Sequence, residues 1–469
     1  MDAGHLNPDR FFDPEPETRR AARLLYEETR ALPIVSPHGH VDPSLLARND
    51  PFPEPTALII QPDHYVLRLL YAHGVSLESL GVPRKDGGAV ESDPRAVWRL
   101  FASRYYLFQG TPSAAWLEYE LSEVFGVHET LLAATADRVY DQIAEKLRSP
   151  EFRPRALFER FNIEVLATTD GAADTLEHHA AIGASGWKGR VIPTFRPDAL
   201  LRIASPESWR AEFDAFERVH GSQITTFAGF LDAIRERRER FRAAGAVATD
   251  HGVIEPLAER ASDAAFLFGR ALAGTATPDD ERRFHAHMLM KMADMSVQDG
   301  LVMQLHAGAL RDHNQTVFET FGRDRGGDIP VATEFTRNLH ELLNAYGNDS
   351  RFTLVAFTLD ESTYSRELAP LAGHYPALRL GAPWWFHDSI AGMTRFRERT
   401  TETAGIYKTA GFTDDTRAFC SIPARHDLSR RMDANYLGGL VARHIIGMDD
   451  ARVMAHALAY DLAKQTYHL

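Results

Sequence analysis

The chain contains a single cysteine, Cys420, among its 469 residues. One thiol cannot form a disulfide within the chain, so the fold must depend on its core, and a reducing compartment is expected. No apolar run reaches the length of about 18 residues that a membrane helix needs, and residues 1–20 lack the apolar segment of a signal peptide. We therefore expect a cytoplasmic protein with no membrane partner.

Positive charge is also in deficit. The sequence has 52 Lys and Arg against 65 Asp and Glu, a net charge of −13. This balance offers no basic surface, so nucleic acid is not an expected partner, and any anionic ligand would need local arginines. The chain also lacks a Gly-x-Gly-x-x-Gly fingerprint and a P-loop, which argues against dinucleotide or nucleoside triphosphate cofactors.

An apolar run that starts at Ile34 ends in two histidines, His38 and His40, two residues apart. On a strand these side chains would leave the same face about 7 Å apart, close enough to share one metal ion. A turn with two merely polar histidines is the alternative. The position favours a site, because the carboxyl end of a first strand is where an α/β barrel keeps its chemistry.

Seven further apolar stretches end in polar residues and alternate with helical segments. This pattern is typical of parallel strands buried on both faces, and eight strands in all predict one (β/α)8 TIM barrel over residues 1–469. An open doubly wound sheet is the alternative. The seven stretches are 163–170, 191–196, 246–251, 301–306, 352–358, 378–384 and, more weakly, 411–415.

The segment after the first strand looks different. A helix is expected at 14–31, but from residue 50 to 154 we find helical patterns and no convincing strand. Inside a barrel, residues 43–155 would form a long helical insertion on the active-site side, either a subdomain or a lid. One of its helices begins near His64, and Tyr65 on it could lean over the site.

Closing the barrel would bring the polar strand ends to one mouth. His38 and His40 from the first strand and Asp415 from the last would be neighbours. They predict a three-ligand site for a divalent metal with one position open, as a catalytic Zn²⁺ site requires. His306 is either a fourth ligand or a polar group that touches substrate. The other polar ends are Asp170, Arg196, Asp250, His251 and Arg417.

Eight motifs in chain order resemble the uronate isomerase (glucuronate isomerase) family of the amidohydrolase superfamily. The resemblance implies isomerisation of D-glucuronate to D-fructuronate and of D-galacturonate to D-tagaturonate. It also implies a TIM barrel of the metal-dependent hydrolase type with one divalent metal, commonly zinc. The matching stretches are His38-Gly39-His40, Asp63-His64-Tyr65, Thr168-Thr169-Asp170, Pro193–Asp198, Asp250-His251-Gly252, Met303–Arg311, Trp384–Ile390 and Thr413–Arg417.

This chemistry moves a proton from C2 to C1 through an enediol, so it needs a base, an electrophile and a cation for the carboxylate. Asp415 or a metal-bound hydroxide is expected to move the proton, assisted by Tyr65, Arg417 and His306. Arg196 is expected to bind the carboxylate, with Arg417 at the metal side. His64 and Tyr65 are expected to contact hydroxyls, and Tyr65 also to assist ring opening. Asp250 and His306 are expected to contact further hydroxyls, and Trp384 and Trp385 the sugar face.

Two other functions would use the same residues. A metal-dependent hydrolase would cleave an amide, lactone or ester, and a two-metal version would add a bridging group at the fourth strand, which ends in Asp250 and His251. A sugar-acid binder without turnover is the other. The chain departs from the family pattern at Ala115, Gly171 and residues 422–427, which bears on the choice of sugar. We further expect a homo-oligomer.

Overall fold

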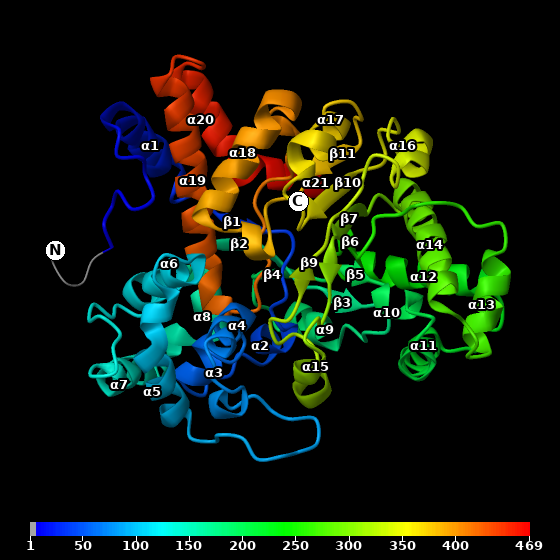
Figure 1. Ribbon diagram of the computed structural model, residues 1–469, viewed down its shortest axis with the longest axis horizontal. Helices are drawn as coiled ribbons and strands as arrows, with labels where there is room; N and C mark the ends of the chain where they lie inside the picture. The colour runs from blue at the N-terminus through cyan, green and yellow to red at the C-terminus, as the bar shows by residue number, and fades with distance from the viewer. Residues whose placement is uncertain (1–5) are drawn as a thin grey trace.

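The computed structural model describes residues 6–469, which form a barrel of parallel strands surrounded by helices (Figure 1). Hydrogen bonds order the strands β1-β2-β4 in one sheet and β3-β5-β6-β7-β10-β11 in the next, and β2 leads directly into β3 as β4 leads into β5. Their bounds are β1 Ile34–Ser36, β2 Ile163–Ala167, β3 Asp170–Gly171, β4 Arg190–Ile192, β5 Phe195–Arg196, β6 Ala248–Val253, β7 Val302–Ala307, β10 Leu354–Thr358 and β11 Leu378–Leu380.

Residues 409–416 occupy the eighth position and close the ring. Thr409 forms a parallel bridge with Leu380 at the end of β11. On the other side, the His40 amide donates to the Thr416 carbonyl over 3.0 Å. The last segment therefore touches both the seventh strand and the continuation of the first, so the predicted barrel is confirmed and the open sheet is excluded.

The eighth segment is less regular than the predicted strand at 411–415. Gly411 has φ 81° and Asp415 has φ 45°, and both values lie outside the extended region. Two such residues interrupt the ladder of backbone hydrogen bonds, which is why the segment closes the barrel without forming a continuous strand. The departure is local, and it sets the direction of the Asp415 side chain at the mouth.

The central strands are apolar on both sides. Every residue of β7 and of β10 is buried. β7 pairs with β6 on one side and β10 on the other, so that Met303 stands opposite both Thr249 and Leu354. Side chains that point inward fill the barrel and those that point outward pack on helices, which explains the near-continuous apolar runs in the sequence.

Helices cover the outside of the barrel. α1 (Pro16–Thr29), where the sequence predicted a helix at 14–31, packs along α19 near the amino-terminal side of the molecule (Figure 1). The other outer helices are α9 Glu177–Ala184, α10 Asp198–Leu201, α11 Pro206–His220, α12 Phe227–Ala243, α13 Ala264–Leu272, α14 Pro278–Asp299, α15 Gln315–Phe321, α16 His340–Tyr346, α17 Ala369–Ala372, α18 Ile390–Ala404, α19 Ile422–Ala442, α20 Met448–His456 and α21 Leu462–Tyr467.

Between β1 and β2 the chain forms helices that gather in one region, drawn in blue and cyan in Figure 1. Trp98, Phe101 and Phe108 of these helices belong to a hydrophobic cluster that also includes Ile34 of β1 and Ile163 of β2, so the insertion packs directly on the barrel. Asp63 caps the helix that carries Tyr65, because its carboxylate accepts the Tyr65 amide over 2.8 Å. The bounds are α2 Pro43–Arg48, α3 Pro55–Ile59, α4 His64–Ala72, α5 Pro94–Arg104, α6 Pro112–Tyr119, α7 Ala136–Leu147 and α8 Pro154–Arg160.

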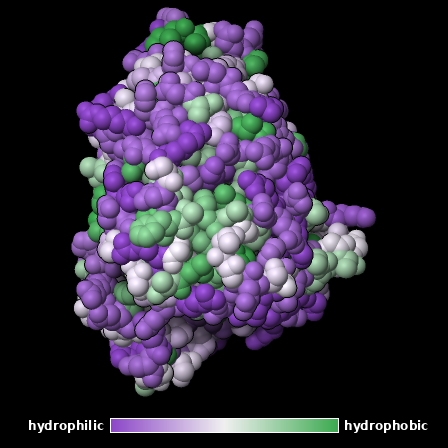
Figure 2. Space-filling model, turned by 90° about the vertical axis from the view of Figure 1, so that its right-hand side faces the viewer, coloured by the Kyte–Doolittle hydropathy of each residue, from purple (hydrophilic) through white to green (hydrophobic). Residues whose placement is uncertain are grey.

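The surface is mainly polar. The side shown in Figure 2 is mostly hydrophilic, with apolar side chains gathered in a limited area near its centre. None of the helices in residues 6–469 combines the length and the apolar character needed to cross a bilayer.

Candidate active site

A cavity of about 440 Å³ opens at the carboxyl ends of the strands. All eleven residues that the sequence analysis assigned to the metal or the sugar line it. They are His38, His40, His64, Tyr65, Arg196, Asp250, His306, Trp384, Trp385, Asp415 and Arg417. Two other polar strand ends, Asp170 and His251, are buried and do not contribute to its lining.

The first and eighth strands bring two imidazoles and a carboxylate together. Asp415 Oδ1 lies 3.3 Å from His38 Nε2 and 3.1 Å from His40 Nε2. Two ligand atoms about 2.1 Å from one Zn²⁺ at tetrahedral angles would stand about 3.4 Å apart. The donor atoms and their spacing therefore fit one divalent cation held by these three side chains, with the cavity on its open side.

The protonation of this cluster also suits a cation. Burial tends to raise the pKa of Asp415, but the imidazoles of His38 and His40 outweigh it and hold this pKa well below its usual range. Burial lowers the pKa of His40 to about 4, whereas at His38 the charges of Asp415 and Asp250 outweigh burial and raise the pKa. The negative charge that raises the pKa of His38 would equally favour a bound cation.

His306 stands next to the cluster and is held by Asp250. Its Nδ1 lies 2.6 Å from Asp250 Oδ1, and its ring stacks on those of His38 and Phe357 with centroids 4.5 and 4.0 Å apart. Among residues 6–469, Nε2 of His306 has no hydrogen-bond partner. His38, Asp250 and His306 also lie close enough to share an ion, but Asp250 is already engaged by His306 and by Arg196.

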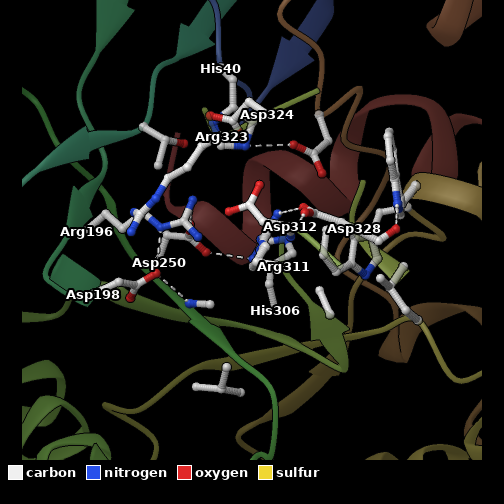
Figure 3. A pocket seen from close by; sticks show the side chains of 18 of the residues that line it. His40, Arg196, Asp198, Asp250, His306, Arg311, Asp312, Arg323, Asp324 and Asp328 are labelled. Atoms are coloured by element: carbon white, nitrogen blue, oxygen red, sulfur yellow. Dashed lines mark hydrogen bonds and ion pairs between the residues drawn. The ribbon is translucent and has the colours of Figure 1, made fainter. Parts of the chain in front are cut away.

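Arg196 enters the cavity from β5 and is flanked by two carboxylates (Figure 3). Its Nε donates to Asp198 over 2.7 Å, and its terminal nitrogen lies 3.3 Å from Asp250 Oδ2. Gly252 on β6 makes room for the guanidinium, because a Cβ there would come within 2.5 Å of an Arg196 nitrogen. Asp198 was part of a recognised motif, yet the sequence did not indicate its place in the site.

The insertion supplies His64 and Tyr65 from the start of α4. The His64 ring meets the edge of Trp385, with centroids 4.3 Å apart. The Tyr65 hydroxyl donates to Asp388 over 2.6 Å, and Arg425 donates to the same carboxylate over 2.9 Å. Sequence reasoning missed Asp388 and Arg425, since neither is at a strand end; the only signal was their presence in or near motif stretches.

A charged loop, residues 311–328, lies at the cavity between two short antiparallel strands, β8 (Ala309–Leu310) and β9 (Ile329–Pro330). Asp324 of this loop pairs with Arg417 over 3.0 Å. The sequence analysis assigned no role to residues 323–328, although their two glycines and four charges are typical of a surface loop.

Backbone strain concentrates at this cavity. Ten non-glycine residues in 6–469 have positive φ, and four of them line it: Asp312, Asp324, Trp385 and Asp415. A non-glycine residue in this conformation costs free energy that the surrounding structure must offset, and such residues cluster at functional sites. The strain supports the assignment of this cavity as the site.

Comparison with known proteins identifies the relatives of this chain. The profile of the family described as glucuronate isomerase matches residues 16–467. A uronate isomerase of Brucella canis is 53% identical over 468 residues, which cover 99% of this chain and 100% of that protein. A uronate isomerase of Nostoc punctiforme is also 53% identical, covering 99% of this chain and 98% of that one.

Solved structures agree with these relatives. The crystal structure of glucuronate isomerase from Caulobacter crescentus superimposes with a TM-score of 0.97 at 50% identity, covering 99% of this chain and 97% of that one. The uronate isomerase of Thermotoga maritima gives 0.91 at 29% identity and 99% coverage of both chains. A putative metal-dependent hydrolase from Lactobacillus casei, at 14% identity and a TM-score of 0.55, shares the fold.

Proposed function

Because this chain belongs to the glucuronate isomerase family, we propose which sugars it converts, which metal it holds and what its residues do. Its activity is uronate isomerisation, which interconverts an aldose acid and a ketose acid. The hydrolase and the inactive binder are therefore set aside. We assign D-glucuronate and D-galacturonate as substrates, with D-fructuronate and D-tagaturonate as products. The main support is the His38-His40-Asp415 cluster facing a cavity lined with arginines.

The metal is assigned to His38, His40 and Asp415. Two neutral imidazole nitrogens and one carboxylate oxygen, spaced as tetrahedral ligands are, suit Zn²⁺. When bound, Zn²⁺ supplies a Lewis acid that polarises the sugar oxygens near C1 and C2. His306 is assigned to the substrate rather than the metal, because Asp250 holds its Nδ1 and leaves Nε2 for a sugar oxygen.

Asp415 is the proposed base. Its pKa lies well below the usual range, so the carboxylate is ionised at neutral pH. Oδ1 faces both imidazoles, and we therefore assign proton transfer between C2 and C1 to Oδ2. Its positive φ is consistent with a side chain held in one direction by the closure of the barrel.

Two arginines bind the anionic sugar. Arg196 is charged and still has N–H groups beyond those on Asp198 and Asp250, so it can hold the C6 carboxylate as a fork. Arg417, at the end of the eighth segment, stands beside Asp415 and serves the oxygens near C1 and C2. Asp324 pairs with Arg417 before substrate arrives.

The remaining cavity residues fix the orientation of the sugar. Burial lowers the pKa of His64 well below its usual value, so its ring is neutral and can accept or donate one hydrogen bond to a hydroxyl. Tyr65 meets another hydroxyl and assists ring opening, and Asp250 orients a third. The indoles of Trp384 and Trp385 form an apolar wall for the sugar face.

The proposal is tested by incubating the zinc-loaded protein with a panel of uronates in D₂O and following the products by NMR. D-Glucuronate or D-galacturonate should give the ketose, with deuterium at C1 to the extent that the base exchanges its proton with solvent. Absence of any ketose from either sugar would refute the substrate assignment. We also propose that the protein is cytoplasmic and that it forms a homo-oligomer. Light scattering of the purified protein tests the oligomeric state.

A further inference from the structure

Behind Tyr65 and outside the cavity, two buried side chains converge on one carboxylate oxygen. Tyr65 and Arg425 both donate to Asp388 Oδ2, over 2.6 and 2.9 Å. The guanidinium of Arg425 lies 3.7 Å from the ring centre of Trp116 and also donates to the Asp414 carbonyl over 3.3 Å. Tyr65 lines the cavity, whereas Asp388 and Arg425 do not.

A second buried pair joins the same part of the fold and shows what a structural ion pair looks like there. Arg397 of α18 donates to both oxygens of Asp433 on α19, over 2.6 and 3.0 Å. Asp388, just before α18, instead uses only Oδ2, and its buried Oδ1 has no hydrogen-bond partner among residues 6–469. Buried carboxylates that serve stability alone are normally satisfied, so Asp388 calls for another explanation.

We propose that Asp388 holds a proton for Tyr65 during the reaction: as Tyr65 takes a proton from a substrate hydroxyl, its own proton passes to Asp388. This inference rests on the proposed isomerisation. Conversion of an aldose to a ketose removes a proton from the oxygen on C2 and adds one to the oxygen on C1. In the first half one substrate O–H bond and the Tyr65 O–H bond break while new O–H bonds form on Tyr65 and Asp388. The second half reverses this order, so no proton is gained or lost.

Tyr65 needs such a partner because it cannot carry the charge itself. Burial and the neighbouring Asp388 carboxylate raise the pKa of the Tyr65 phenol well above its usual value, so a lasting phenolate is unfavourable. Its hydroxyl hydrogen already points at Asp388, which leaves an oxygen lone pair for a proton from the cavity. Asp388 has a pKa raised to about 7 by burial and held there against a larger rise by Arg425. It can therefore both accept and return a proton near neutral pH.

The other charges around Asp388 are few and come from identified elements. Arg68 of α4 and Asp415 of the eighth segment act on it or on Tyr65 through their charges. Beyond Arg425 lie Asp63 and Glu120, and burial raises the pKa of Glu120 to about 8. A neutral Glu120 does not compete with Asp388 for the positive charge of Arg425, which favours ionisation of Asp388.

We test the relay with Asp388→Asn in the zinc-loaded enzyme, using Asp433→Asn as the matched control. Wild type should show kcat rising with pH to a plateau, with an apparent pKa near 7, because Asp388 must be ionised to accept the proton. Asp388→Asn should lower kcat about a hundredfold, with KM changed by less than about threefold. It should also remove the rise of kcat with pH, which we call the acidic limb of the pH profile. Asp433→Asn should lower the melting temperature but leave both kcat and the acidic limb of the pH profile unchanged.

The relay would be overturned if Asp388→Asn kept the acidic limb of the pH profile, or if its kcat stayed within about threefold of wild type. If Asp388→Asn does not fold, Tyr65→Phe decides, because it removes one oxygen and leaves the Asp388–Arg425 pair intact. The acidic limb of the pH profile should also vanish in Tyr65→Phe, and a limb that remains in this variant would contradict the relay. Where both variants fold, the double variant Tyr65→Phe/Asp388→Asn should have a kcat less than about threefold below that of Tyr65→Phe alone. Once Tyr65 has lost its hydroxyl, Asp388 has no proton to receive, so its loss adds little. Wild type that converts no uronate refutes the function itself, which separates the two failures.

Discussion

The cavity has two walls of different origin. The strand wall consists of side chains at strand ends: His38, His40, Arg196, Asp250, His306, Asp415 and Arg417. The inserted wall consists of His64 and Tyr65 from α4, the loop 311–328, and Trp384 and Trp385 after β11. Backbone ladders fix most of the first wall, whereas side-chain contacts between segments far apart in sequence fix the second.

This difference suggests a division of labour. Groups on rigid strands hold the spacing that proton transfer and metal binding require, and loops and insertions vary with less cost to the fold. We therefore expect substitutions on the strand wall to cause the larger losses. Apart from Tyr65, whose proposed role is proton transfer, we expect substitutions on the inserted wall to change how tightly, and which, sugars bind. The predictions below test that ranking.

The largest loss is expected for Asp415→Asn. An amide cannot take the proton from C2 and is a weaker metal ligand than a carboxylate, so kcat should fall by about a thousandfold or more. Turnover and bound zinc per chain, measured together, separate the two causes. Retention of zinc with lost turnover would assign proton transfer to Asp415, and a kcat within about tenfold of wild type would remove it from the role of base.

Among substitutions that weaken binding of the sugar, Arg196→Met should give the largest effect. A charge-assisted pair with a carboxylate contributes about 2 kcal/mol, so the variant should raise KM for uronates about thirtyfold with a smaller change in kcat. An unchanged KM would show that another cation binds the carboxylate. The variant also leaves Asp198 and Asp250 without their cation, so its melting temperature must be measured alongside.

Gly252→Ala gives a graded version of this test without removing the charge. The new Cβ would approach an Arg196 nitrogen within 2.5 Å and Asp198 Oδ2 within 3.0 Å, so the guanidinium must move. KM should rise about three- to tenfold while kcat stays within about twofold of wild type. The backbone φ at Gly252 is not positive, so little loss of stability is expected.

The two walls also differ in how far the sequence predicted them. The strand wall was predictable because apolar runs with polar ends mark parallel strands, and the first and last strands of a barrel must meet. This placed His38, His40 and Asp415 together, as the structure now has them. Even the irregular eighth segment was found by its polar end at Asp415, although its positive φ was not foreseen.

The partners of the inserted wall were beyond the same reasoning. Asp388 and Arg425 are 37 residues apart and meet Tyr65 only through tertiary packing of α4, α18 and α19. No periodicity reports such a contact. Asp170 shows the opposite error, because it ends a strand as predicted but lies away from the cavity, where Thr168 donates to it over 2.7 Å.

On the inserted wall, His64→Ala should cost less than Asp415→Asn or Arg196→Met. The loss of one neutral hydrogen bond corresponds to about 1 kcal/mol, so KM should rise about fivefold. The effect should differ between D-glucuronate and D-galacturonate if His64 meets the C4 hydroxyl, where the two sugars differ. Steady-state kinetics with both sugars measure this. A fall in kcat comparable to that of Asp415→Asn would contradict the division between the walls.

Asp170→Asn should change activity least of all, by less than about twofold, because Asp170 ends a strand without facing the substrate. Burial raises the pKa of Asp170 to about 7, above its unfolded value. Its contribution to stability is therefore present in acid, declines as pH rises from about 4 to about 7, and stays low above that range. The variant has no charge to bury, so its melting temperature should exceed that of wild type more at pH 8 than at pH 4.5. Equal differences in melting temperature at the two pH values would show that Asp170 is ionised throughout. A strong loss of activity in Asp170→Asn would show that Asp170 takes part in the site.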